Sequence, residues 1–550
     1  MFSRKIAVLA LAVIAILSST AKAQITINYT RNIVYDWNEK LIQVIRADKI
    51  PSQFGALYFA SLNSIIYETL GQFSRPKSSF VVLNYAGWDQ DLAIADPIGA
   101  GAFAGHYLLS EWFKTKQEAS FSWTYPANSS TPNNGFKQFK VDYASFNSLL
   151  NEQLTNYNIP SGDIRSASRR VARNLYRAIW RDRVADGSND FVALSVSRVF
   201  RNYTYPATYG QFVLASSQRS ALYPQLNATK TFVINSITTR STDSIARAPA
   251  PQGDRSLADL LSVKDLGRKD STVRTEKETE NAIFWWDPAG TASVPGRWIY
   301  ISIDLIEKQT KTNLTLLQKS QILAQVSTAM ADVGIVAWDV KYKVQRWRPA
   351  TALVYGGLFN TSEAYAQYID TTFKALLPVP AHPEYPSGHS ASAGAAIGVL
   401  TAWFGDNSTA FTTYGESEGI LADDGVTVIH PGVANVSRVY KSLKKAGQDV
   451  GLSRVQGGIH YQYSADEGLS LGTSLGKSVQ TGYPGRLSVT PPATPAVWQR
   501  YGDLPTETLL PLVWIVLAII VFASLKYQQW QDQKEYQKIL YQKGISVAAQ

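Results

Sequence analysis

One helix that ends in cations constrains this sequence more than any other feature. Apolar residues recur at near-helical spacing from Leu316 to Val336, as they do on a helix face that packs into a core. The stripe runs into "KYKVQRWRPA" (Lys341 to Ala350). The cations of this segment are Lys341, Lys343, Arg346 and Arg348. Buried cations need an anion beside them. Few carboxylates follow nearby, so either the charges are solvated or the anion comes from elsewhere.

Length and composition limit the classes of function. The 550 residues can bury a large core, in two or more domains or in one large helical unit. The net charge of +10 is not gathered into a basic stripe, so we expect no nucleic-acid partner, whereas a basic pocket for a small anion remains compatible. The chain contains no cysteine, which excludes disulfides, thiol catalysis and cysteine-ligated metals.

Both ends of the chain carry membrane signals. Arg4 and Lys5 precede an apolar run and then "AKA", the order of a secretory signal peptide, although an uncleaved anchor is the alternative. Near the other end, Leu509 to Leu525 holds 17 residues without a charge. As a helix it would span roughly 26 Å, enough to cross a bilayer, although a buried core helix is the alternative. Lysines follow it, as expected on the cytosolic side.

These signals predict a single-pass membrane protein of the secretory pathway, with its catalytic domain outside the cytoplasm at the cell surface or in a lumen. The predicted parts are a signal peptide (1–23), a helical catalytic domain (24–482), a Pro-rich stalk (483–507), a transmembrane helix (508–525) and a basic cytoplasmic tail (526–550). Sequons for N-glycosylation begin at Asn28, Asn128, Asn202, Asn227, Asn313, Asn360, Asn407 and Asn435.

Helical patterns dominate the predicted catalytic domain, which is therefore expected to be all-α. Asp36 is a candidate cap, Pro51 a candidate helix start, and further helices are expected over 97–113 and 163–180. Two short segments, "TFVINSI" (231–237) and "RWIYISI" (297–303), are candidate strands. The polar stretch 241–281 is expected to be a long loop or linker.

Two motifs supply groups that suit an oxyanion. "HPEYPSGHS" places Ser387, Gly388 and His389 after a proline and before a run of small residues, which predicts a helix N-terminus with free N–H groups. "GLSRVQGGIHY" sets Arg454 six residues ahead of His460, with a glycine pair that implies a turn between them. Together with Lys341 and Arg348, these groups can surround a tetrahedral or trigonal-bipyramidal oxyanion. The missing anion would then be a ligand.

The three segments resemble the signature of the vanadium-dependent haloperoxidases and the type 2 phosphatidic acid phosphatases. Lys341 to Arg348-Pro349, Pro386 to His389, and Ser453-Arg454 to His460 match that signature with its spacing intact. "YDWNEKLIQVIRADKIP", "AIFWWDPAG" and "MADVGIVAWDVKYKVQRWRPATA" extend the resemblance over roughly residues 35 to 480. The resemblance implies packed helical bundles with the anion, vanadate, held within one bundle.

The resemblance also implies a role for each matched residue. His460 would be the ligand of vanadium, and the equatorial oxygens would be bound by Lys341, Arg348, Arg454, Ser387 and the Gly388 N–H. His389 would act as acid–base toward hydrogen peroxide, and Lys341 would make the bound peroxide electrophilic, so that halide is oxidised to hypohalous acid and halogenates small organic acceptors. Trp338 and His382 match the positions that line the family's halide pocket, and a histidine there favours bromide or iodide.

The sequence is compatible with two other functions. The pocket residues equally suit an acid phosphatase or phosphotransferase in which His460 is the nucleophile and His389 protonates the leaving group. A non-catalytic cell-surface binding protein is the second alternative. His382 could instead pair with Glu384 as a metal ligand, although no third partner is near. Lys343 and Arg346 are expected to be solvated, and Trp285 and Trp286 to lie in the core. Halide preference, organic acceptor and oligomeric state do not follow from the sequence.

Overall fold

The structure is a computed structural model. It describes residues 31–74, 87–118, 142–183, 186–188, 208–214, 221–309, 313–406, 409–422, 425–434 and 436–483. The predicted signal peptide, transmembrane helix and cytoplasmic tail lie outside the described residues, as does all but the first residue of the predicted stalk. No helix within the described part of the chain is both long enough and apolar enough to span a bilayer.

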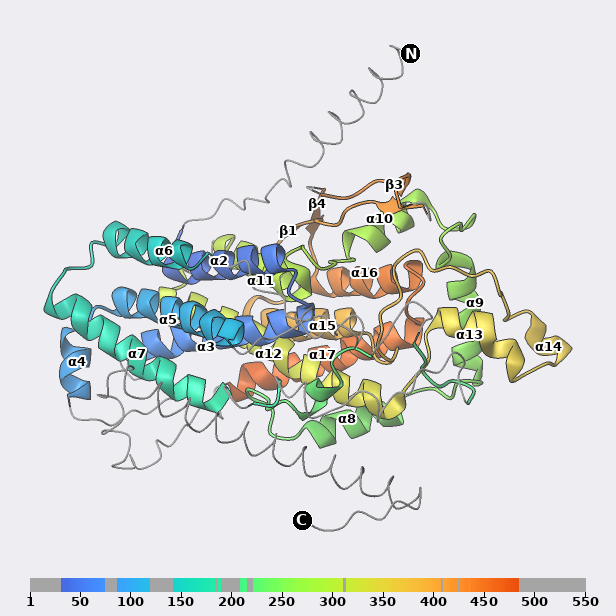
Figure 1. Cartoon of the computed structure of the whole chain (residues 1–550), viewed down its shortest axis with the longest axis horizontal. Helices are drawn as coiled ribbons and strands as arrows, with labels where there is room; N and C mark the ends of the chain where they lie inside the picture. The colour runs from blue at the N-terminus through green and yellow to red at the C-terminus, as the bar shows by residue number, and fades with distance from the viewer. Residues whose placement is uncertain are drawn as a thin grey trace, which may run out of the picture. The chain divides into compact units, whose positions relative to one another are not determined.

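Helices make up most of the described chain (Figure 1). The N-terminal helices are α2 (Ile33–Asp48), α3 (Ser52–Gly71), α4 (Trp88–Ile94), α5 (Pro97–Glu118), α6 (Tyr143–Asn156) and α7 (Asp163–Arg183). The middle of the chain forms η2 (Pro224–Ala228), α8 (Ile237–Ala246), α9 (Asp254–Leu266), α10 (Glu276–Phe284) and α11 (Ser293–Glu307). The remainder forms α12 (Leu316–Val344), α13 (Pro349–Tyr355), η3 (Gly356–Leu358), α14 (Glu363–Ala366), α15 (Gly388–Phe404), α16 (Leu443–Gln456) and α17 (Gln462–Gly482).

Helix α12 connects two groups of helices. It packs on α3, which belongs with α2, α5 and α7, and it also packs on α15 and α17 (Figure 1). A capping box of Thr315 and Gln318 begins α12, and Gln345 ends it in the left-handed region at φ 50°. Because α12 touches both groups, nearly all of its side chains from Ile322 onward are buried. Its last turn delivers Lys341 into the interior.

Several predicted elements differ from the structure. Two small antiparallel sheets, β1 (Phe411–Tyr414) with β4 (Ser437–Tyr440) and β2 (Ile420–Leu421) with β3 (Val428–His430), make the fold mostly helical rather than all-α. The strand prediction for 297–303 is wrong, since that segment lies in α11. Its apolar run reflects a helix buried on nearly every side, where periodicity gives no signal. The segment 231–237 forms no strand either.

The linker prediction for 241–281 is also wrong. This polar stretch contains most of α8, all of α9 and the start of α10, and its composition reflects short helices with largely exposed faces. Helix α10 has a full capping box between Thr275 and Glu278. Helix α2 is capped by Asn32 rather than by Asp36, because the Asn32 side chain accepts hydrogen bonds from the first free N–H groups. The predicted helices at 51, 97 and 163 are confirmed.

Candidate active site

Lys341 connects α12 to the segment that leads into α15. Its ammonium group is fully buried and donates to the carbonyl oxygens of Pro383 at 3.1 Å, Glu384 at 2.8 Å and Pro386 at 2.5 Å. Three N–H donors therefore meet three acceptors. This brings the first and second sequence motifs into direct contact, although they lie more than 40 residues apart.

Arg348 brings the third motif to the same place. Its Nη1 donates to the Ile459 carbonyl at 2.7 Å and lies 3.1 Å from Nε2 of His460. Its Nη2 lies 3.1 Å from Nδ1 of His382. Because a guanidinium can only donate, the His460 Nε2 and the His382 Nδ1 are the acceptors in these contacts. Arg348, the N-cap residue of α13, thus fixes the tautomer of His460, whereas His382 Nδ1 also lies 3.1 Å from the Pro383 carbonyl, which can only accept.

Glu384 is a site residue that the sequence reasoning did not assign to His460. Its Oε1 lies 2.6 Å from Nδ1 of His460 and accepts from the Tyr461 N–H at 3.2 Å. His460 therefore carries its proton on Nδ1, and its unprotonated Nε2 faces Arg348. A histidine metal ligand backed by a carboxylate has the same tautomer. Glu384 is paired with His460 and not with His382. Within the described residues, no group of three or more His, Asp or Glu could hold a metal ion.

Arg454 contributes a buried guanidinium from the last turn of α16. Its Nε donates to Ser453 Oγ at 3.0 Å, and its Nη2 donates to the carbonyls of Trp285 at 2.8 Å and Ala282 at 3.3 Å. Its Nη1 is buried and has no hydrogen-bond partner. A buried donor without an acceptor is costly, because its hydration is lost and nothing replaces it. An oxyanion at this position would remove that cost.

The start of α15 has the predicted form. Ser387 is the N-cap, and its side chain accepts from the Ser390 N–H. A Cβ added to Gly388 would lie 3.5 Å from the Trp338 ring, so even alanine would fill the space beside that indole. His389 Nε2 lies 2.9 Å from the Trp286 carbonyl and must donate to it, which leaves Nδ1 as the free basic nitrogen.

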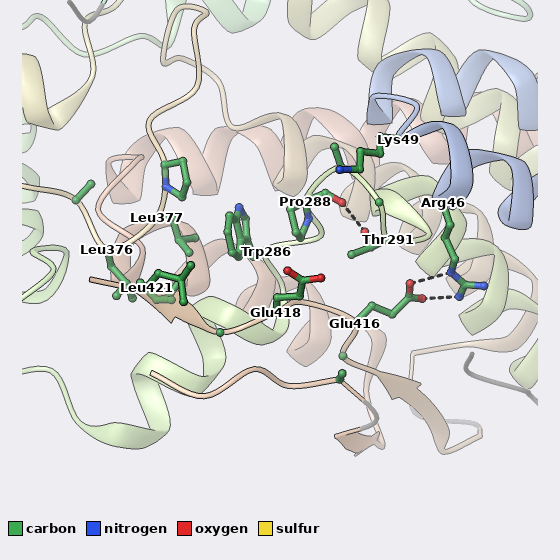
Figure 2. Close-up of a pocket in the computed structure, with 18 of the residues that line it drawn as sticks. Arg46, Lys49, Trp286, Pro288, Thr291, Leu376, Leu377, Glu416, Glu418 and Leu421 are labelled. Carbon is green, nitrogen blue, oxygen red and sulfur yellow. Dashed lines mark hydrogen bonds and ion pairs between the residues drawn. The ribbon is translucent and has the colours of Figure 1, made fainter. Parts of the chain in front are cut away.

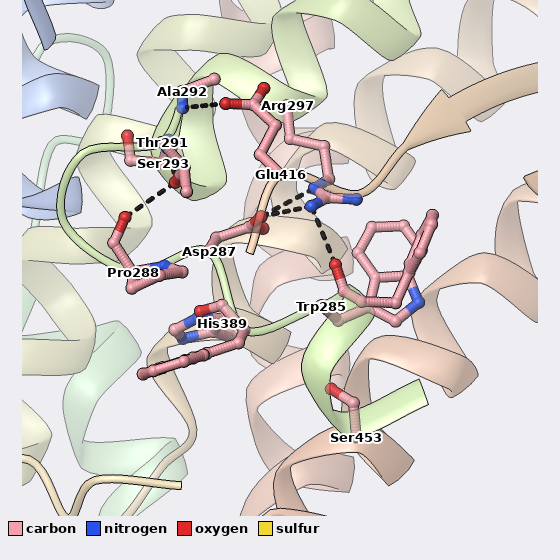
Figure 3. Close-up of polar contacts among 12 residues, drawn as sticks. Trp285, Asp287, Pro288, Thr291, Ala292, Ser293, Arg297, His389, Glu416 and Ser453 are labelled. Atoms are coloured by element: carbon pink, nitrogen blue, oxygen red, sulfur yellow. Dashed lines mark hydrogen bonds and ion pairs between the residues drawn. The ribbon is translucent and has the colours of Figure 1, made fainter. Parts of the chain in front are cut away.

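A network of polar contacts fixes the loop that supplies these carbonyls. The Arg297 guanidinium donates to Asp287 Oδ1 at 2.9 Å and to the Phe284 carbonyl at 2.8 Å, while Glu416 accepts from the Ala292 N–H at 2.8 Å. Figure 3 shows Arg297, Asp287 and Glu416 above His389, with Trp285 to the right and Ser453 below. The loop between α10 and α11 is therefore held at both ends. It presents the Trp285 carbonyl to Arg454 and the Trp286 carbonyl to His389.

The site holds more positive charge than its carboxylates balance. Burial, and next the charge of Arg348, lowers the pKa of Lys341 well below its usual range. Burial likewise lowers the pKa of Arg348 to about 10 and that of Arg454 to about 9. Burial raises the pKa of Glu384 to about 7, although Arg348 and Lys341 act against the increase. Burial makes the charged form of these side chains unfavourable, and a bound anion would stabilise it. The site therefore suits an added anion.

Burial also keeps the site histidines neutral. It lowers the pKa of His460 well below 6.5, with Arg348 and Lys341 adding to the effect. It lowers that of His389 in the same way, with Arg454 the next contributor. Neutral imidazoles at physiological pH can accept a proton or bind a metal, and imidazolium can do neither. His389 can therefore act as a base, and His460 can act as a ligand.

Trp338 and His382, the predicted halide-pocket pair, lie against each other. Their ring centroids are 5.0 Å apart at an interplanar angle of 44°. The Lys341 ammonium lies 5.7 Å from the centroid of the Trp338 ring. The pair thus borders the cationic cluster and presents a largely apolar surface to it.

Two predictions about neighbouring residues need correction. Arg346 is buried rather than solvated, because its guanidinium donates to the Pro249 carbonyl and lies 6.0 Å from the Tyr463 ring centroid. Lys343 remains partly exposed and pairs with Asp339 at 2.6 Å. Trp285 lies in the core as expected, whereas Trp286 lines a cavity.

Part of the chain resembles a known protein domain. Residues 321–483, which contain all three motifs, match the family model "VCPO second helical-bundle domain". This part of the chain therefore resembles the second helical bundle of the vanadium haloperoxidases. A comparison with curated protein sequences gave no match.

The vanadium haloperoxidase fold extends beyond the second bundle. A solved bacterial vanadium-dependent iodoperoxidase is 20% identical, with a TM-score of 0.58, covering 84% of this chain and 98% of the other. A holo-type bacterial vanadium-dependent chloroperoxidase is 14% identical, with a TM-score of 0.53, covering 84% and 100%. Its apo-type counterpart is also 14% identical, with a TM-score of 0.50, covering 80% and 95%. At these identities the likeness concerns the fold.

Proposed function

We propose that this protein is a vanadate-dependent haloperoxidase that oxidises halide with hydrogen peroxide to hypohalous acid. One observation carries the proposal: three buried cations surround a histidine whose Nε2 is unprotonated and faces Arg348, with Glu384 as the carboxylate bonded to its Nδ1. The unpaired Arg454 Nη1 and the N-terminus of α15 add donors for anionic oxygens. The residues therefore fit vanadate in charge, in hydrogen bonding and in the unprotonated Nε2 that His460 offers as a ligand.

Each residue has a defined task in this proposal. His460 would hold vanadium through Nε2, while Arg348, Arg454, Ser387 and the Gly388 N–H would hold its oxygens. Lys341, whose three N–H groups donate to carbonyl oxygens, would contribute its positive charge. Bound vanadate would supply a Lewis-acidic centre that polarises peroxide. His389 would accept the peroxide proton at Nδ1, because its Nε2 is committed to the Trp286 carbonyl. Peroxide, halide and one proton give hypohalous acid and water.

Trp338 and His382 would receive the halide. An imidazole and an indole form a polarisable wall, which suits a large, weakly hydrated anion, and we therefore propose bromide or iodide ahead of chloride. The ratio of kcat/KM values for the three halides, measured at one peroxide concentration, tests this order. A higher value for chloride than for bromide would overturn it.

The decisive experiment follows two activities in one preparation. Purified full-length protein is loaded with orthovanadate and given peroxide, bromide and a dye, while hydrolysis of p-nitrophenyl phosphate is measured in parallel. Bromination that requires vanadate and is lost in His389→Ala supports the proposal. His106→Ala is the matched control, because His106 contacts Asn147, outside the site. Silence in both assays would favour a binding protein.

An acid phosphatase is the second candidate, and one observation favours it. The Glu384 carboxylate bonded to His460 Nδ1 also suits a nucleophilic histidine, since it stabilises the positive charge that develops when Nε2 attacks phosphorus. Hydrolysis without bromination, inhibited by vanadate, would establish this function instead.

We also propose that the catalytic domain lies outside the cytoplasm, anchored by residues 508–525. The support comes from the sequence of the two ends. A glycosidase-sensitive mass shift, together with protease accessibility in sealed vesicles, tests this topology.

A further inference from the structure

A large cavity lies beside the candidate active site. Its volume is about 1010 Å³, which is at the upper end of the range for pockets that hold drug-sized molecules. Most of its lining comes from four separate parts of the chain, residues 43–49, 286–291, 375–379 and 415–421, and Lys269 and Ala434 complete it. Figure 2 shows the Trp286 ring among these lining residues, with Leu377 and Leu421 on one side of it and Pro288 on the other.

Hydrogen bonds tie this cavity to the site at two points. The Trp286 side chain lines the cavity, while its carbonyl accepts the hydrogen bond from His389 Nε2 at 2.9 Å. Leu377 is also part of the lining, and its backbone N–H donates to the Gly457 carbonyl at 2.9 Å, in the turn that precedes His460. A molecule in the cavity would therefore lie next to both histidine segments.

The chemistry of the lining selects one class of ligand. Trp286, Leu376, Leu377, Pro378, Ile420 and Leu421 give it an apolar wall that includes an indole face. At the rim, Arg46 forms a bidentate ion pair with Glu416, with N–O distances of 2.8 and 3.0 Å. The three lining cations outnumber the two lining carboxylates, so the cavity is net positive. Among the described residues, no hydrogen bond or ion pair occupies the exposed Lys49 ammonium.

We propose that this cavity binds the organic acceptor, an apolar aromatic molecule that carries one anionic group. Its rings lie against Trp286 and the leucines, and its anion lies at Lys49. The identification as acceptor rests on the proposed function. Hypohalous acid formed beside His389 then meets an electron-rich ring carbon, a carbon–halogen bond replaces the carbon–hydrogen bond, and the released proton leaves with hydroxide as water.

Binding is tested in the full chain without vanadate, halide or peroxide. The probes are 8-anilinonaphthalene-1-sulfonate, an anion, and N-phenyl-1-naphthylamine, its neutral counterpart, both followed by fluorescence. Leu421→Asp should weaken both probes by at least about tenfold, because it puts a charge on the apolar wall. Leu358→Asp is the matched control, since Leu358 is 64% exposed and not part of the lining, and it should change neither probe.

Lys49→Gln separates the charge from the apolar wall. It should weaken the sulfonate by up to about fivefold, as the loss of one exposed charge pair does, and leave the neutral probe unchanged. Equal effects of Leu421→Asp and Leu358→Asp would overturn the cavity as the binding site. No effect of Lys49→Gln on the sulfonate would overturn the anionic requirement.

The same comparison extends to catalysis. In vanadate-loaded protein, KM for bromination of 2-naphthol-6-sulfonate should rise in Lys49→Gln, while KM for 2-naphthol should not. If the protein binds the probes as described but never brominates, the proposed function and the acceptor role are wrong, and the ligand site stands. If the protein brominates but the cavity variants have no effect, the cavity is not the acceptor site and the proposed function stands.

Discussion

At the level of single residues, Glu384 decides how His460 can be used. The carboxylate is fully buried and lies 2.6 Å from His460 Nδ1, so it fixes the tautomer and makes Nε2 more basic. The charge of Glu384 also acts to raise the pKa values of Lys341 and Arg348, against the larger lowering by burial. The more basic Nε2 strengthens binding of a metal-centred anion, whereas the negative charge of Glu384 weakens binding of any anion. A variant without the carboxylate can therefore separate the two effects.

We expect Glu384→Gln to bind vanadate about tenfold less tightly, because the loss of the carboxylate weakens the Nε2 lone pair that would ligate vanadium. Phosphate, which would be held by charge and hydrogen bonds alone, should bind as well as before or better, since the site becomes more positive. Calorimetric titration of both anions into the wild type and the variant measures the change in ratio. Parallel weakening of vanadate and phosphate would show that Glu384 only supports the fold.

At the level of secondary structure, the contact between α15 and α17 sets the position of the Ser387–His389 turn. The two helices approach so closely that glycine is required on both. A Cβ on Gly398 would lie 2.5 Å from the Thr473 carbonyl oxygen, and one on Gly472 would collide with the Ala391 carbonyl. Such contacts cannot be relieved by rotating a side chain, because the obstructing atoms belong to the backbone.

We expect Gly472→Ala to lower the free energy of unfolding by about 1–3 kcal/mol, because the extra methyl group pushes α15 away from α17. The shift of α15 should also reduce bromination, since it moves Ser387 and His389. Gly334→Ala is the matched control: nothing lies within 4 Å of the added Cβ, and alanine favours the helix by up to about 1 kcal/mol. Denaturant unfolding of both variants checks the opposite signs. Destabilisation by both substitutions would contradict this explanation.

At the level of the whole molecule, the buried histidines make stability depend on pH. Burial, followed by the charges of Arg348 and Lys341, lowers the pKa of His382 well below 6.5. Below pH 6.5 the unfolded chain binds a proton at this residue and the folded chain does not, so stability falls as the pH falls. His460 is a poorer reporter, because the raised pKa of its partner Glu384 gives a contribution of opposite sign.

We therefore expect vanadate-free protein to lose stability between pH 7 and pH 5.5, and His382→Asn to lose less. The difference should approach about 1.4 kcal/mol per pH unit below 6.5, the value for one proton taken up only on unfolding. Denaturant unfolding at several pH values, at constant ionic strength, measures both slopes. Identical slopes for the two proteins would mean that His382 titrates normally in the folded state.

The sequence by itself determined the chemical groups and most of the long helices. Local signals were enough for α3, α5 and α7. The motifs supplied Lys341, Arg348, Ser387, His389, Arg454 and His460, with Ser387 expected at a helix N-terminus and a turn expected ahead of His460. Local signals misled where burial on all sides removed periodicity, as in α11, and where short surface helices read as a linker, as in 241–281.

Only the tertiary structure decided what those groups contact. Glu384 and His460 are 76 residues apart, and Arg454 and the Trp285 carbonyl are 169 apart. The cavity at Trp286 likewise combines residues from distant segments of the chain. Propensity and periodicity act over a few turns of helix, whereas such pairs depend on how α12, α15, α16 and α17 pack. The buried charges and their partners therefore become defined only when the bundle closes around them.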